Sequence, residues 1–133
     1  MEGSGLGSLL TIFLSGIIAI LIFDTVGALA ARRFQFNYVR LTVGSLLIYL
    51  SLGVLVGPHG TVIQAGMLTG GVGLVEATAG WAISWRLGPG RPEGAAAEPS
   101  AVLRSIVSVV LMASVFGATA AYVGSLVLGS RTP

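Results

Sequence analysis

The chain has 133 residues and a mass of 13.5 kDa, which is the size of one small domain. Hydrophobic residues make up 54% of it and charged residues only 9%, whereas a typical soluble domain has about 25% charged residues. Together with a mean hydropathy of +0.94, this composition excludes a water-soluble globule. It also excludes a disordered chain, which would be polar and rich in charge. The class that fits is an integral membrane protein.

The net charge of +2 comes from seven arginines and no lysine, and the arginines form no continuous basic run. Membrane topology therefore explains them better than a nucleic-acid partner does. The absence of cysteine excludes disulfides and thiolate metal sites. No basic segment precedes the first apolar stretch, so we expect that stretch to be a permanent span rather than a cleaved signal peptide.

Four apolar segments predict four transmembrane helices, at about residues 8–31, 39–56, 62–86 and 101–128. Each approaches or exceeds the roughly 20 mostly apolar residues that a bilayer requires. Gly57-Pro58-His59-Gly60 divides the second helix from the third, because this density of Gly and Pro marks a tight turn. The expected fold is an all-α compact bundle forming a single domain over 1–133, with a flexible cytoplasmic linker at 88–100. A parallel repeat of two helical hairpins, each with one acidic residue, is an open alternative.

Arginines border the first and third connections of the predicted helices and are absent from the second. The positive-inside rule then places both Arg-bearing loops in the cytoplasm and both termini outside, for a multi-pass protein of the cell (inner) membrane.

Asp24 and Glu76 are the two ionisable residues inside the predicted spans. Asp24 lies eight positions before Arg32, and Glu76 lies ten before Arg86. At a rise of about 1.5 Å per residue, both acids sit roughly 12–15 Å from the inner arginines, and therefore at one depth. A charged side chain there costs at least about 2.5–3.5 kcal/mol and is commonly functional. We interpret the pair as an ion- or proton-binding site; a structural bond between helices, worth about 0.6 kcal/mol, is the alternative.

The same depth argument selects hydroxyl groups on the returning helices as partners of the acids. Such groups can bond a carboxyl group in either protonation state. We predict a supporting polar layer formed by Ser45, Tyr49, Ser108 and Ser114. Neither a metal site nor a cofactor is expected, because two carboxyl groups are too few for a hard divalent cation.

Small residues at spacings of three and four mark one face of the third helix and one face of the fourth. Such faces let helix backbones approach closely in lipid. The predicted packing residues are Gly66, Gly70, Gly73 and Gly80 on the third helix and Ala113, Gly117 and Ala121 on the fourth.

Function is predicted from the acids, since no catalytic motif is present and an enzyme is not expected. The leading hypothesis is a cation- or proton-linked transporter or channel, or a subunit of one, that uses the intramembrane carboxylates. The alternative is a non-catalytic membrane scaffold or accessory subunit that assembles with other membrane helices. Expected partners are the lipid bilayer and either further copies of the chain or other membrane subunits, with no nucleic acid. A water-accessible cavity that ends at both acids favours transport, whereas acids buried between close-packed helices, each bonded to a hydroxyl, favour the scaffold.

Overall fold

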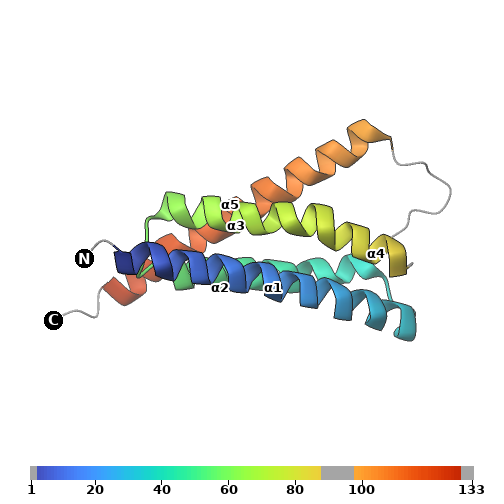
Figure 1. The fold of residues 1–133 in the computed structure, drawn as a ribbon, viewed down its shortest axis with the longest axis horizontal. Coiled ribbons are helices and arrows are strands. Elements are labelled where there is room, and N and C mark those ends of the chain that lie inside the picture. Colours follow the sequence, from blue (N-terminus) through green and yellow to red (C-terminus); the bar gives the residue numbers. More distant parts are fainter. Residues whose placement is uncertain (1–2, 88–97, 130–133) are drawn as a thin grey trace.

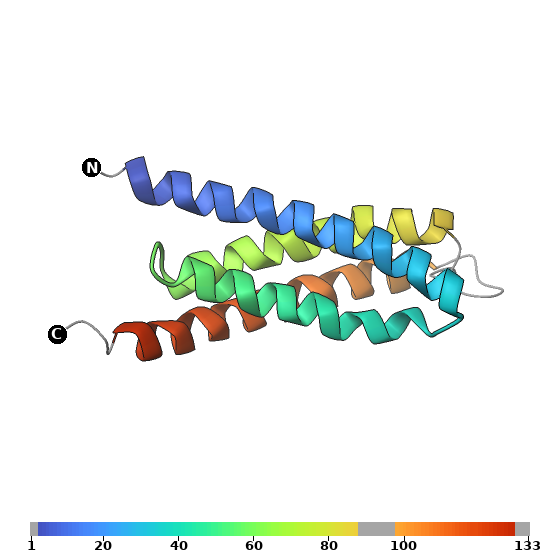
Figure 2. The same cartoon turned by 90° about the horizontal axis from the view of Figure 1, so that it is seen from below.

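The computed structural model describes residues 3–87 and 98–129, and 92% of these residues are helical. The prediction of an all-helical protein is thus confirmed. Three helical segments are long and apolar enough to cross a membrane: Gly5–Phe34, Val62–Leu87 and Pro99–Val127. The helices run roughly along one long axis, with the start of α1 and the end of α5 at the same end of the molecule (Figures 1 and 2).

Helix α1, Gly3–Phe34, is longer than the predicted 8–31 at both ends. No proline interrupts this part of the chain, and the helix continues to its two terminal arginines. It stops where Gln35 takes a left-handed conformation, with φ at 54°. The side-chain amide of Gln35 donates a hydrogen bond to the Arg32 carbonyl oxygen at 2.9 Å, which satisfies one of the last carbonyls of the helix.

The second segment begins with a 3-10 turn, η1, at Tyr38–Leu41, which leads directly into α2, Thr42–Val56. Together they match the predicted 39–56 closely. With 15 residues, α2 alone is shorter than the other apolar segments. The following turn closes as predicted, because the N–H groups of His59 and Gly60 donate to the Val56 carbonyl at 2.8 and 2.9 Å.

The third segment is continuous but not uniform. It consists of α3, Val62–Val75, then η2, a π-helical turn at Glu76–Gly80, and then α4, Trp81–Leu87. A capping box starts it: the Thr61 hydroxyl accepts from the Gln64 N–H at 3.2 Å, and the Gln64 side-chain oxygen accepts from the Thr61 N–H at 2.8 Å. The π turn interrupts the single helix predicted over 62–86.

Helix α5, Pro99–Gly129, begins two residues before the predicted start. Proline suits a first helical turn, because its missing N–H has no partner there in any helix. The Glu98 carbonyl accepts from the N–H groups of Ala101 and Val102 at 2.9 and 3.1 Å. The last part of the predicted linker is therefore helical, and its residues 88–97 lie outside the described part of the chain.

Helix α5 is the main packing partner of both α3 and α2. Near its start it diverges from α4 (Figure 1), and among the described helices α4 packs on α1 instead. The buried core between the helices consists of two clusters. One is formed by Ile20, Tyr49, Leu52, Val72 and Ala113, and the other by Val56, Ala65 and Ala121.

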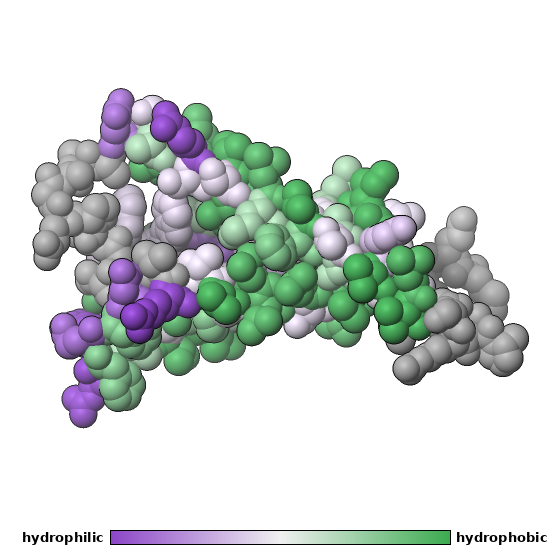
Figure 3. Space-filling model, turned by 180° about the vertical axis from the view of Figure 1, so that it is seen from behind, coloured by the Kyte–Doolittle hydropathy of each residue, from purple (hydrophilic) through white to green (hydrophobic). Residues whose placement is uncertain are grey.

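Large apolar side chains cover the outside of the molecule. On α1 they recur every four residues, from Leu6 through Leu10, Leu14, Ile18 and Ile22 to Val26, and each is more than half exposed. Hydrophilic side chains gather at one end of the view in Figure 3, with apolar ones over the middle. A surface of this kind is favourable in contact with lipid and unfavourable in contact with water. The apolar helices therefore indicate a membrane protein.

Candidate functional site

Glu76 is held by two hydroxyl groups from α2. The Ser45 hydroxyl donates to Oε1 of Glu76 at 2.5 Å, and the Tyr49 hydroxyl donates to Oε2. Ser45 is 3% exposed and Tyr49 is fully buried. Because the two donors are four residues apart, one face of α2 presents both of them. The carboxyl group thus accepts a hydrogen bond at each of its two oxygens.

Glu76 begins the π turn, where the third helical segment changes the helix it packs against. Within η2 the Trp81 N–H donates to the Glu76 carbonyl, five residues back, in place of the four of an α-helix. Before this turn α3 packs mainly on α5, and after it α4 packs on α1. Turns of this type recur at functional sites, because the wider turn redirects side chains that a regular helix would keep on one stripe.

Asp24 reaches the same turn from α1. Its side chain is 3% exposed, and its carboxyl group lies directly against the backbone of Gly80. A Cβ atom at Gly80 would stand 3.0 Å from Cγ of Asp24 and 3.6 Å from Cγ of Glu76, and it would overlap Oδ2 of Asp24. Both acids therefore adjoin one point on the backbone. The absence of a side chain at Gly80 is what lets the Asp24 carboxyl group approach that point.

A cavity of about 130 Å³ joins the two acids. Its walls come from every long helical segment, since it is lined by Asp24, Leu41, Thr42, Ser45, Glu76, Trp81, Val109 and Met112. The volume exceeds the roughly 30 Å³ that a water molecule occupies in the liquid, so a hydrated proton or a small cation fits. Two of the lining residues carry carboxyl groups and two carry hydroxyl groups, and the other four are apolar.

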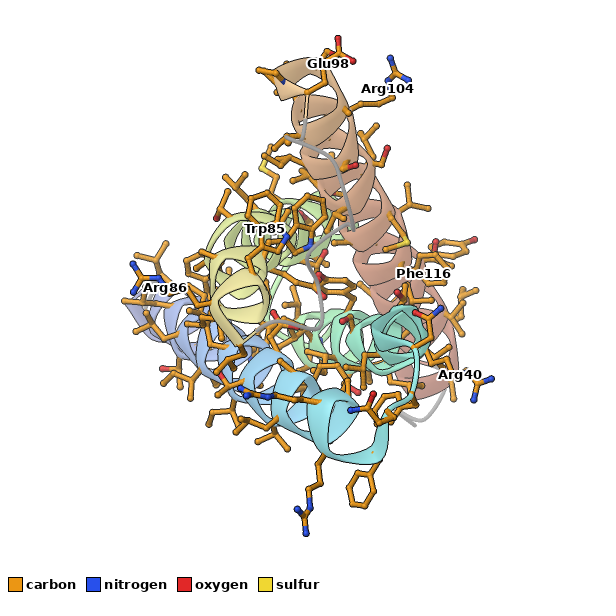
Figure 4. All side chains as sticks on the ribbon, turned by 90° about the vertical axis from the view of Figure 1, so that its right-hand side faces the viewer. Arg40, Trp85, Arg86, Glu98, Arg104 and Phe116 are labelled. Carbon is orange, nitrogen blue, oxygen red and sulfur yellow. The ribbon has the colours of Figure 1, made fainter. Side chains whose placement is uncertain are left out.

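The cavity lies toward the arginine end of the molecule. On its other side, toward the termini, the packed cluster of Ile20, Tyr49, Leu52, Val72 and Ala113 fills the space between the helices. Toward the arginine end, Leu41 and Trp81 are the lining residues that come from η1 and α4. In Figure 4, which looks onto this end, the Trp85 side chain lies between α4 and α5.

The other two predicted hydroxyls do not join this layer. Ser108 is exposed, and its hydroxyl donates to the Arg104 carbonyl of its own helix at 2.9 Å. Ser114 lies in the contact between α5 and α3, beside Gly70. The prediction failed for these two serines because the number of residues from an arginine indicates position along a helix. It does not indicate which side of the α5 axis a residue faces. Thr42 and Trp81 line the cavity and were not among the predicted site residues.

The predicted small residues divide between packing and the site. A Cβ at Gly66, Gly70 or Gly73 would contact α5, at Ser114 or at Ala113. A Cβ at Gly117 would overlap Thr69 of α3, and Ala121 is buried in the cluster with Val56 and Ala65. Gly80 differs, since it faces Asp24 of α1 and belongs to the site itself.

The chemistry open to this arrangement follows from two carboxyl groups in one enclosed space. Two negative charges side by side in a low-dielectric cavity repel strongly, and a proton or a cation between them removes that repulsion. Among the described residues no group of three or more His, Cys, Asp and Glu side chains gathers as a metal site would require. His59 is exposed in the turn after α2. The site therefore suits a proton or a monovalent cation better than a divalent metal.

Comparisons with known protein families, with curated proteins and with solved structures returned no match to this chain, so its function is argued from the site alone.

Proposed function

We propose that the chain is a cation- or proton-linked membrane transporter or channel, or a subunit of one, with Asp24 and Glu76 as its binding groups. The observation that carries this proposal is the cavity lined by both carboxyl groups. An acid inside a membrane is costly, and two acids that share a cavity are costlier still unless a positive ion is bound between them. A purely structural bond between helices would need neither the second acid nor the cavity.

In the proposed topology, four spans cross the cell (inner) membrane with both termini outside. Three helices have the length and hydropathy for this, and η1 with α2 supplies the fourth crossing. Five described arginines support the orientation, because Arg32, Arg33, Arg40, Arg86 and Arg104 belong to the ends of helices that meet the first and third connections. The positive-inside rule puts that end in the cytoplasm.

The proposed binding step starts from the cytoplasmic side. A proton or cation enters past Leu41 and Trp81, because the cluster around Tyr49 and Leu52 closes the other side. Ser45 and Tyr49 hold Glu76 in place, and their hydroxyls can reorient when its charge changes. Release to the outside then requires the packed cluster to open.

Flux through purified protein in proteoliposomes tests the proposal. An imposed pH or cation gradient should drive uptake in the wild type, and Asp24→Asn or Glu76→Gln should lower the rate at least about tenfold by removing a charged ligand. Glu98→Gln is the matched control, because this exposed acid at the start of α5 lies outside the cavity. A wild type no faster than empty liposomes would refute transport by this chain alone, and amide variants as fast as the wild type would refute the role of the two acids.

A scaffold or accessory subunit is the second candidate. It is favoured by the two hydroxyl bonds to Glu76 and by an apolar groove of about 460 Å³ between α2 and α5. The groove is lined by Leu50, Val54, Thr119, Ala120, Val123, Gly124 and Val127. Under this proposal the groove receives a helix of another subunit or of a second copy, and the bonds to Glu76 only fix α2 against η2. Gentle extraction should then yield a stoichiometric complex that Val54→Trp weakens, whereas a chain isolated only as a single protomer contradicts it.

A further inference from the structure

A second cavity lies at the arginine end, separate from the acids. It has a volume of about 710 Å³ and lies between the end of α1 and the end of α4. Its lining residues are Ala31, Arg32, Gln35, Phe36, Asn37, Arg86 and Leu87. None of them lines the cavity of the acids, so the two cavities share no lining residue.

The described residues that line this cavity carry positive charge and include no acidic side chain. Arg32 and Arg86 come from two different helices, and no described residue that lines the space is acidic. Asp24 and Glu76 belong to the other cavity. Figure 4 shows Glu98 beside Arg104 at the start of α5, well apart from Arg86. Two guanidinium groups in one polar cavity favour an anion.

The backbone around Gln35 gives this cavity its shape. The left-handed conformation of Gln35 ends α1, and the two residues that follow it, Phe36 and Asn37, also line the cavity. The bond from the Gln35 amide to the Arg32 carbonyl fixes this turn. The lining therefore combines two guanidinium groups, from α1 and α4, with the two side-chain amides and the aromatic ring of the turn after α1.

We propose that this cavity binds a phosphate group through Arg32 and Arg86. The planar fork of a guanidinium group matches two phosphate oxygens, and Arg32 and Arg86 bring two such forks from separate helices to the lining of one cavity. The phosphate belongs either to the headgroup of an anionic phospholipid or to a free phosphate ion. Basic pockets between helices on the cytoplasmic side bind lipid headgroups in this way. The proposal is independent of any transport by Asp24 and Glu76.

Native mass spectrometry of the full chain in neutral detergent tests this inference. The probes are phosphatidylglycerol, phosphatidylcholine as the zwitterionic comparison, and inorganic phosphate as a competitor. The variants are Arg32→Gln and Arg86→Gln. Arg33→Gln is a closely matched control, because it removes the same charge from the adjacent position of α1 and does not line the cavity.

The wild type should retain phosphatidylglycerol in preference to phosphatidylcholine, and each of the two cavity variants should weaken that binding about fivefold to tenfold, as expected for one lost contact to phosphate. Arg33→Gln should bind like the wild type. Displacement by millimolar inorganic phosphate identifies free phosphate as the ligand, and resistance to it identifies the lipid. The inference fails if the wild type neither prefers the anionic lipid nor binds phosphate. It also fails if Arg33→Gln loses as much affinity for the anionic lipid as Arg32→Gln does. Thermal unfolding of each variant separates a lost ligand from a lost fold.

Discussion

Tyr49 of α2 donates a hydrogen bond to Glu76 in the π turn, 27 residues later in the chain. This bond joins two helical segments. Its donor is fully buried, in the cluster that closes the site toward the termini. The same side chain therefore holds the carboxyl group and forms part of the wall behind it. A change at Tyr49 is expected to affect both the stability of the fold and the properties of the site.

Tyr49→Phe should lower the free energy of unfolding by about 1 kcal/mol, since it removes a donor from a buried carboxyl group while the ring keeps its packing. Unfolding in mixed micelles measures this change. Tyr122→Phe is the matched control. Because Tyr122 is 54% exposed on α5, this substitution should leave the free energy of unfolding nearly unchanged. Equal effects of the two substitutions would show that the bond to Glu76 contributes nothing.

Gly80→Ala should displace the Asp24 carboxyl group, because the new Cβ would overlap its Oδ2. A cost of about 1–3 kcal/mol is expected for overpacking a buried contact. In an Asp24→Ala background the same substitution should cost about 1 kcal/mol less, because the obstructing carboxyl group is gone. The double-mutant cycle is read from unfolding free energies.

Gly7→Ala is the control for this cycle, since no atom lies within 4 Å of a Cβ at Gly7. If Gly80→Ala were as mild as Gly7→Ala, or if its cost were the same with and without Asp24, the close approach of α1 to η2 would be wrong.

Gly53→Ala should separate α2 from α5. A Cβ there would overlap the Gly117 carbonyl oxygen and stand 2.9 Å from its carbon, and backbone atoms cannot rotate away as a side chain can. We expect a loss of about 2 kcal/mol or more in unfolding free energy. Gly124→Ala lies in the same helix pair, where the nearest Val54 atoms are 3.8 and 4.0 Å away, so it should be neutral or slightly stabilising. A cost at Gly124 equal to that at Gly53 contradicts this packing.

The helices and the level of the acids could be predicted from the sequence, because hydropathy and distance from the arginines both report depth in a membrane. The predicted grouping of Glu76 with Ser45 and Tyr49 used depth together with a shared helical face, and the structure brings these three side chains into contact. Ser108 had the right depth but faces outward. Only the packing of α5 against α2 and α3 decides which of its faces is buried.

The π turn could not be predicted, since a bond to the fifth residue back leaves no mark on hydropathy. It also explains why Gly80 was assigned to helix packing, because a regular helix keeps it on the same stripe as Gly66, Gly70 and Gly73. The capping box at Thr61 and Gln64 is visible in the sequence as a Thr-x-x-Gln pattern ahead of an apolar run.

The central claim is that Asp24 and Glu76 belong to one site, and a double-mutant cycle of Asp24→Asn and Glu76→Gln tests it most directly. The measured quantity is the free energy of unfolding of the wild type, the two single variants and the double variant in mixed micelles. Because residues that share one site are energetically coupled, the cost of the double variant should differ from the sum of the two single costs by more than about 0.5 kcal/mol. Costs that add to within about 0.5 kcal/mol would contradict the claim, since they would mean that the two acids act independently.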